Sequence, residues 1–97
     1  MGLDVIEEKN LNDVIIYALD YPGMVLAEAR SLIPDNAVLS DFAYGLYVGY
    51  ISGVFFDGFL IRNKRFLNDD EMSDFHTILF KRSPEIWLKI KAHLHLK

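Results

Sequence analysis

The densest group of chemically capable side chains is an acidic cluster in the C-terminal half: Asp69, Asp70, Glu71 and Asp74. Carboxylates at this spacing can hold a cation or work as a general acid and base. The same residues also fit a helix start, in which Asn68 caps the first turn and Glu71 bonds back to it. Because this capping box accounts for every member except Asp74, we predict a helix start here rather than a catalytic site.

The histidines and glycines do not form a recognisable reaction site. His93 and His95 diverge by about 200° on a helix, so they cannot bind one metal ion together. The closely spaced glycines lie inside a predicted helix and not in a phosphate-binding loop. The chain has no cysteine, which excludes disulfides, thiol catalysis and thiolate metal sites. We therefore expect no catalytic residue, no metal and no cofactor, and we predict a protein that is not an enzyme.

The best basic segment consists of Arg62, Lys64 and Arg65, which Lys89 in the last predicted helix extends. Cations in a row can contact phosphates, so a nucleic-acid-binding regulator that uses residues 62–65 and the C-terminal helix is the alternative function. The nearby acidic cluster would repel phosphates, and the cations are few and scattered. For these reasons we do not favour nucleic-acid binding.

Composition indicates one small domain with surplus apolar surface. The 97 residues are 52% hydrophobic and 25% charged, so the chain is rich in apolar residues for its size. Residues 1–41 hold eight acids and two bases, a net charge of −6, and residues 42–97 carry +2. The N-terminal sequence is acidic and has no long apolar core, so it resembles no secretory signal. We expect a soluble, cytoplasmic protein with residues 1–97 in a single helical domain.

Hydrophobic periodicity predicts an all-α, compact bundle of about five helices. The expected helices cover about 11–19, 22–33, 41–56, 68–82 and 84–94, and Asn10 or Asn12 would cap the first. Asp57-Gly58 reads as the end of the long helix, because glycine readily adopts the left-handed conformation that follows a helix. A helix ending there is about 24 Å long, which is short for a bilayer core of about 30 Å, so we do not favour a membrane span.

The central helix, approximately residues 41–56, is rich in glycine and aromatic residues. Gly45, Gly49 and Gly53 share one side of this helix, and Phe42 and Phe56 bracket them. Each glycine costs a helix roughly 0.5–1 kcal/mol relative to alanine, so three on one side indicate close approach by another element. That element is another helix of the same chain, a second copy in a symmetric homodimer, or a neighbour in a membrane.

The leading functional hypothesis is a small protein–protein interaction module that self-associates. Its class would be that of a regulator, adaptor, inhibitor or immunity-type factor, because no chemistry is visible and apolar residues are in surplus. Aromatic side chains anchor interfaces, and the N-terminal half is acidic. We therefore expect Glu7, Glu8, Tyr17 and Tyr21 to be exposed and to contact a protein partner. The sequence does not indicate which protein this partner is.

Overall fold

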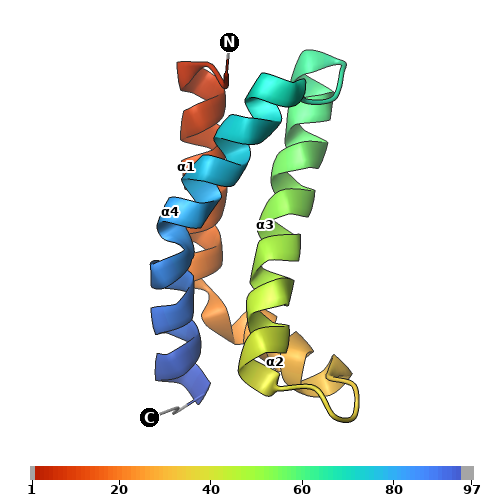
Figure 1. Cartoon of the computed structure of the whole chain (residues 1–97), viewed down its shortest axis with the longest axis vertical. Coiled ribbons are helices and arrows are strands. Elements are labelled where there is room, and N and C mark those ends of the chain that lie inside the picture. The colour runs from red at the N-terminus through yellow and green to blue at the C-terminus, as the bar shows by residue number, and fades with distance from the viewer. Residues whose placement is uncertain (1, 95–97) are drawn as a thin grey trace.

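The computed structural model describes residues 2–94, most of which lie in helices. Within that range there are four helices and no strand: α1 (Val5–Asp20), α2 (Pro22–Leu32), α3 (Leu39–Asn63) and α4 (Asp69–Leu94). The bundle measures 41 × 22 × 20 Å. Helices α1, α3 and α4 run along the long axis, and the short α2 lies near the beginning of α3 (Figure 1). The predicted all-α class is confirmed.

Helix α3 supplies the central row of the core. Ala43, Tyr47, Ile51, Phe55 and Phe59 are all buried, and each follows the previous one by four residues. Side chains four apart lie above one another on a helix, so this row faces the other three helices along the whole length of α3. The central position predicted for this helix is confirmed, and its buried side is opposite the glycines.

Helix α3 does not stop at Asp57-Gly58 as the sequence suggested. Gly58 has no positive φ and stays helical, and the helix continues until Lys64, which adopts the left-handed conformation at φ 59°. The Lys64 N–H donates to the Leu60 carbonyl at 2.8 Å. The extra turns form because Phe59 is completely buried in the core. Burial of a phenylalanine, about 1.5–3 kcal/mol, outweighs the cost of one helical glycine.

Helix α4 is one continuous helix, although the sequence predicted two helices separated at Ser83-Pro84. Pro84 has no N–H to donate to the carbonyl of Phe80, four residues earlier. The Ser83 hydroxyl donates to that same Phe80 carbonyl at 2.7 Å. The hydrogen bond lost to proline is thus replaced, and Figure 1 shows α4 changing direction part-way along its length. The bundle therefore has four helices where about five were expected.

The helix starts were only partly predictable. The capping box at the start of α4 is confirmed: Glu71 N–H donates to Asn68 Oδ1, and Asn68 N–H donates to Glu71 Oε1, both at 2.8 Å. Pro22 opens α2 as expected. Helix α1 begins six residues earlier than predicted, because Asp4 caps it through a 2.8 Å bond from the Glu7 N–H. Asn10 and Asn12 lie inside this helix.

Candidate interaction surfaces

One end of the bundle holds a buried carboxylate, Glu7, that joins the start of α1 to the end of α3. Arg62 Nη2 donates to Glu7 Oε1 at 2.6 Å, and Arg62 Nε donates to Oε2 at 3.0 Å. Asn63 Nδ2 donates to Oε2 at 2.8 Å, and Asn10 Nδ2 donates to Oε1 at 3.3 Å. The Arg62 hydrogen bonds, aided by both amides and opposed by burial, lower the pKa of Glu7 from 4.5 to about 2.

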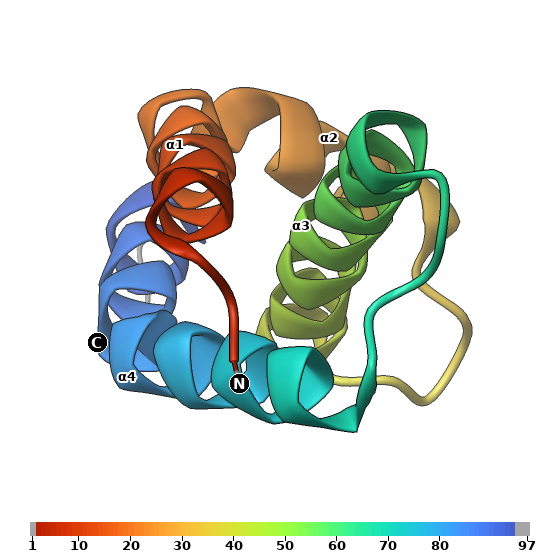
Figure 2. The ribbon, with the colours of Figure 1, turned by 90° about the horizontal axis from the view of Figure 1, so that it is seen from above.

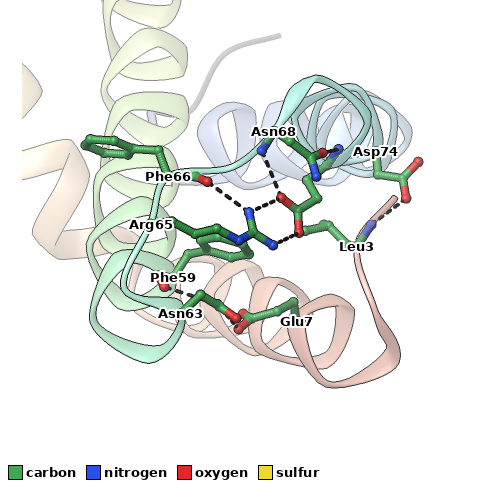
Figure 3. A network of polar contacts seen from close by, with 9 residues as sticks. Leu3, Glu7, Phe59, Asn63, Arg65, Phe66, Asn68 and Asp74 are labelled. Atoms are coloured by element: carbon green, nitrogen blue, oxygen red, sulfur yellow. Dashed lines mark hydrogen bonds and ion pairs between the residues drawn. The ribbon is translucent and has the colours of Figure 1, made fainter. Parts of the chain in front are cut away.

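A second arginine–carboxylate pair lies near Glu7, where α3 leads into α4, and Figure 3 shows its Arg65. Arg65 Nη1 and Nη2 donate to Glu71 Oε1 and Oε2 at 2.7 and 3.0 Å. The same guanidinium lies 5.3 Å from the centre of the Phe59 ring. Hydrogen bonding from Arg65 lowers the pKa of Glu71. Leu3 N–H donates to Asp74 at 2.9 Å, so the acidic cluster takes part in joining the chain's beginning to α4.

These ion pairs affect two groups of predicted site residues. The prediction that Glu7 is exposed is wrong, because only 4% of this residue is accessible and its carboxylate binds Arg62 within the chain. Arg62 and Arg65, half of the proposed nucleic-acid contacts, each bind an intramolecular carboxylate. Lys64 is exposed at the end of α3, and Lys89 is half-buried on α4.

The three glycines of α3 face outward and meet no other helix. A side-chain carbon added at Gly45, Gly49 or Gly53 would find no described atom within 4 Å. The expectation that another helix of the same chain crosses here is therefore wrong for the described residues. Asp41 precedes this glycine row and Asp57 follows it at the same spacing of four, and both are exposed. We call these five residues the outer row of α3.

The two aromatic residues expected to bracket the glycines are only half-buried, and one of them turns toward the core. The Phe56 ring centre lies 4.8 Å from that of Phe75 on α4. Phe42 packs against the edge of the core near the start of α3. The exposed surface of α3 is therefore narrower than the predicted self-association face, and glycines dominate it.

An apolar trough follows the same side of α3, next to the outer row. A cavity of about 450 Å³ between α2 and α3 is lined by Met24, Val25, Glu28, Leu32, Leu46 and Tyr50. A second cavity, of about 330 Å³, lies between α1 and α3 and is lined by Asp13, Val14, Tyr17, Tyr50 and Val54. Tyr50 borders both cavities, and we call the two together the trough, which follows the 46–50–54 side of α3. Each of its α3 residues is close to a glycine of the outer row.

Two of the predicted partner contacts belong to this part of the surface. Tyr17 and Tyr21 are 50% and 56% exposed, and their ring centres are 4.7 Å apart. Tyr17 lines the trough. Glu8 is exposed on α1, as expected, and no ion pair of its side chain is found within residues 2–94. The structure thus brings Tyr17 together with the glycine side of α3, and it separates Glu7 from both.

A second exposed apolar feature lies on α4. Phe80 and Leu88 are 78% and 67% exposed, and Pro84 between them is also exposed. The three are spaced by four residues and project away from the core, which α4 meets through Phe75, Leu79, Ile86 and Ile90. We call Phe80, Pro84 and Leu88 the α4 ridge. Lys81 lies beside Phe80, and Lys91 lies beside Leu88.

Sequence reasoning missed both the trough and the ridge. A break assumed at Pro84 assigned Phe80 and Leu88 to separate helices, so their common side was not apparent. The sequence signal for the ridge was the separation of eight residues between Phe80 and Leu88, which places both on the same side of a continuous helix. The trough had no comparable signal, because it depends on how α1 and α2 pack against Tyr50.

No protein family model, curated protein or solved structure matches this chain. Its function must therefore be inferred from its own residues. Among residues 2–94, α3 is the one helix that by length and composition could cross a membrane, and only 22% of its most apolar stretch is buried. In the same range, no group of three or more histidine, aspartate or glutamate side chains is arranged to hold a metal ion. His95 lies outside the described residues.

Proposed function

We propose that this chain is a non-enzymatic, cytoplasmic protein–protein interaction module that self-associates, acting as a regulator or adaptor. The observation that carries the proposal is the bare outer row of α3. Three exposed helical glycines cost the isolated chain about 1.5–3 kcal/mol relative to alanine. No contact within residues 2–94 offsets this cost. A second polypeptide that packs closely against the glycines would offset it.

The surroundings of the outer row support the same function. The trough is lined mainly by apolar side chains, and Tyr17 and Tyr50 present aromatic rings of the kind that anchor protein interfaces. Exposed apolar residues that gather around a concave surface mark sites of association rather than ordinary surface. Acidic residues at the margins, such as Glu28, favour a partner surface that carries lysine or arginine.

The nucleic-acid alternative is less well supported. Arg62 and Arg65 already bind Glu7 and Glu71, so a phosphate would have to compete with two short ion pairs. Lys64 and Lys89 are left, and Lys64 caps the end of α3 whereas Lys89 lies on α4. Such a pair gives a small electrostatic footprint compared with the row of cations that nucleic-acid binding usually needs.

Co-purification of two differently tagged copies of the chain tests the proposed function. Gly49→Leu adds a bulky side chain at the centre of the outer row, and we expect it to abolish co-purification while circular dichroism shows unchanged helix content. Gly23→Leu is the matched control, because this glycine is equally open but lies on the opposite side of α2 from the trough. Loss of co-purification with both variants, or with neither, would contradict the assignment of the α3 surface.

A further inference from the structure

We propose that self-association is head-to-tail: the α4 ridge of one copy occupies the α3 trough of the next. This inference rests on the proposed function and names the occupant of the α3 surface. The ridge and the trough are different surfaces of the same chain. Each copy therefore uses one to bind the preceding molecule and the other to bind the following molecule.

The two surfaces match in shape. Phe80, Pro84 and Leu88 are spaced by four along α4, and the trough residues Leu46, Tyr50 and Val54 have the same spacing on α3. The first and last members of each series are eight positions apart, about 12 Å along the helix. Ridges formed by residues four apart pack into grooves of the same periodicity in the commonest class of helix contact. The glycines beside the trough allow the ridge to approach the α3 backbone closely.

The two surfaces also match in charge. Lys81 and Lys91 flank the ridge, and neither has an ion pair within residues 2–94. Glu28 lines the trough and likewise has no ion pair in that range, and Asp41 and Asp57 are exposed at the ends of the outer row. A lysine-flanked apolar ridge is therefore complementary to an acid-flanked apolar trough.

A symmetric dimer through α3 is less favourable than this arrangement. The outer row reads Asp41, Gly45, Gly49, Gly53, Asp57, which is symmetric about Gly49. When two such rows face each other about a two-fold axis at Gly49, an aspartate meets an aspartate at both ends, in the parallel and the antiparallel orientation. Like charges placed opposite one another oppose association. The ridge instead carries Lys81 and Lys91 and no aspartate.

One copy cannot fill its own trough. The ridge is on the side of α4 that points away from the core, whereas the trough is formed by α1, α2 and α3. Seen from above, the first part of α4 runs along the edge of the bundle opposite α2 (Figure 2), and α4 also contacts α2 within the bundle. The two surfaces therefore face different directions, and the ridge that enters a trough must come from another molecule.

Mixing two defective variants tests the head-to-tail arrangement. Gly49→Leu obstructs the trough side of α3 and leaves the ridge intact, whereas Leu88→Glu places a charge on the ridge and leaves the trough intact. We expect each variant alone to bind itself about tenfold or more weakly than the wild type, as for loss of a central interface residue. Their equimolar mixture should form a stable one-to-one complex, measured by size-exclusion chromatography with light scattering.

The outcomes separate this inference from the proposed function. One outcome is that Leu88→Glu self-associates like the wild type, Gly49→Leu does not, and mixing the two does not restore binding of Gly49→Leu. The assembly is then symmetric through α3, so the head-to-tail inference fails and the proposed function stands. If the wild type itself does not associate, both fail. A charge-reversed pair gives an independent check: Glu28→Lys should bind a Lys81→Glu, Lys91→Glu variant more tightly than it binds the wild type, and equal or weaker binding would overturn the assigned charge contact.

Discussion

Glu7 shows how a single side chain in this protein serves stability rather than recognition. Glu7 is an acid in a position that faces the core, and it is stabilised there by Arg62, Asn63 and Asn10. A buried carboxylate is tolerable only when such partners replace its water. The residue that appeared to be a binding contact instead joins the start of α1 to the end of α3, between residues 55 positions apart.

Replacing this carboxylate should destabilise the fold in a pH-dependent way. Glu7→Gln removes the charge that Arg62 binds, and we expect a loss of about 2 kcal/mol at neutral pH. Because the pKa of Glu7 is lowered from 4.5 to about 2 in the folded state, its contribution is complete above about pH 4.5 and disappears as the pH falls toward 2. Urea unfolding from neutral to acidic pH should show the wild type and variant converging in this window. Glu8→Gln, on the exposed neighbour, is the control, and an equal loss there would contradict the account.

For Tyr47, in contrast to Glu7, we expect that loss of the polar group does not destabilise the fold. Its hydroxyl is buried without a hydrogen-bond partner among the described residues, and burial raises its pKa. Removal of an unsatisfied buried polar group is neutral or favourable, so Tyr47→Phe should leave stability unchanged or raise it by about 1 kcal/mol. Thermal unfolding measures the change, with Tyr44→Phe as a control at the half-buried ring that stacks on Trp87. A clear loss of stability in Tyr47→Phe alone would show that the hydroxyl is bonded in solution.

At the scale of helices, the sequence predicts boundaries set by adjacent residues better than boundaries set by distant contacts. The capping box at Asn68 and the proline that opens α2 were recognisable because both act through adjacent residues. Continuation through Gly58 and Pro84 depends on distant partners: Phe59 needs the rest of the core, and the α4 core residues need α1, α2 and α3. Local signals cannot report such tertiary stabilisation, which often overrides helix propensity.

The Ser83 hydroxyl should contribute to the stability of the fold only because Pro84 follows it. Ser83→Ala leaves the Phe80 carbonyl without its donor, and we expect a loss of about 1 kcal/mol. In a Pro84→Ala background a backbone N–H is again available to that carbonyl, so the same serine substitution should have little effect. A double-mutant cycle of unfolding free energies measures the coupling. Additive effects of the two substitutions would show that the hydroxyl does not replace the lost helix bond.

The α3 glycines should reduce stability while favouring association. Gly49→Ala meets no described atom, so it should raise the unfolding free energy of the dilute monomer by about 0.5–1 kcal/mol and weaken self-association. Gly58→Ala is the control in the same helix, because its added carbon would lie 2.6 Å from Arg62 Nη1 and would disturb the pair with Glu7. We expect a smaller gain, or a loss, for Gly58→Ala. A destabilised Gly49→Ala monomer would mean that the glycine row is not open.

At the scale of the whole molecule, the trough beside α3 and the α4 ridge are two unlike apolar surfaces of one bundle. The sequence identifies the glycine side of α3 as a packing surface. It does not show whether this side faces inward or outward, because the orientation depends on which side of α3 the other helices cover. The trough and the α4 ridge exist only after α1, α2 and α4 have packed. A head-to-tail assembly of such molecules either closes into a ring or grows into a chain.

The most direct test of the account is the mass of the wild-type protein in solution as its concentration increases from micromolar toward millimolar. Sedimentation velocity measures this mass without immobilising either surface. Self-association through the α3 surface predicts a mass that rises above the 11.2 kDa of one chain, and head-to-tail contacts predict that it continues beyond twice that value. A single species of 11.2 kDa at every concentration would contradict the central claim.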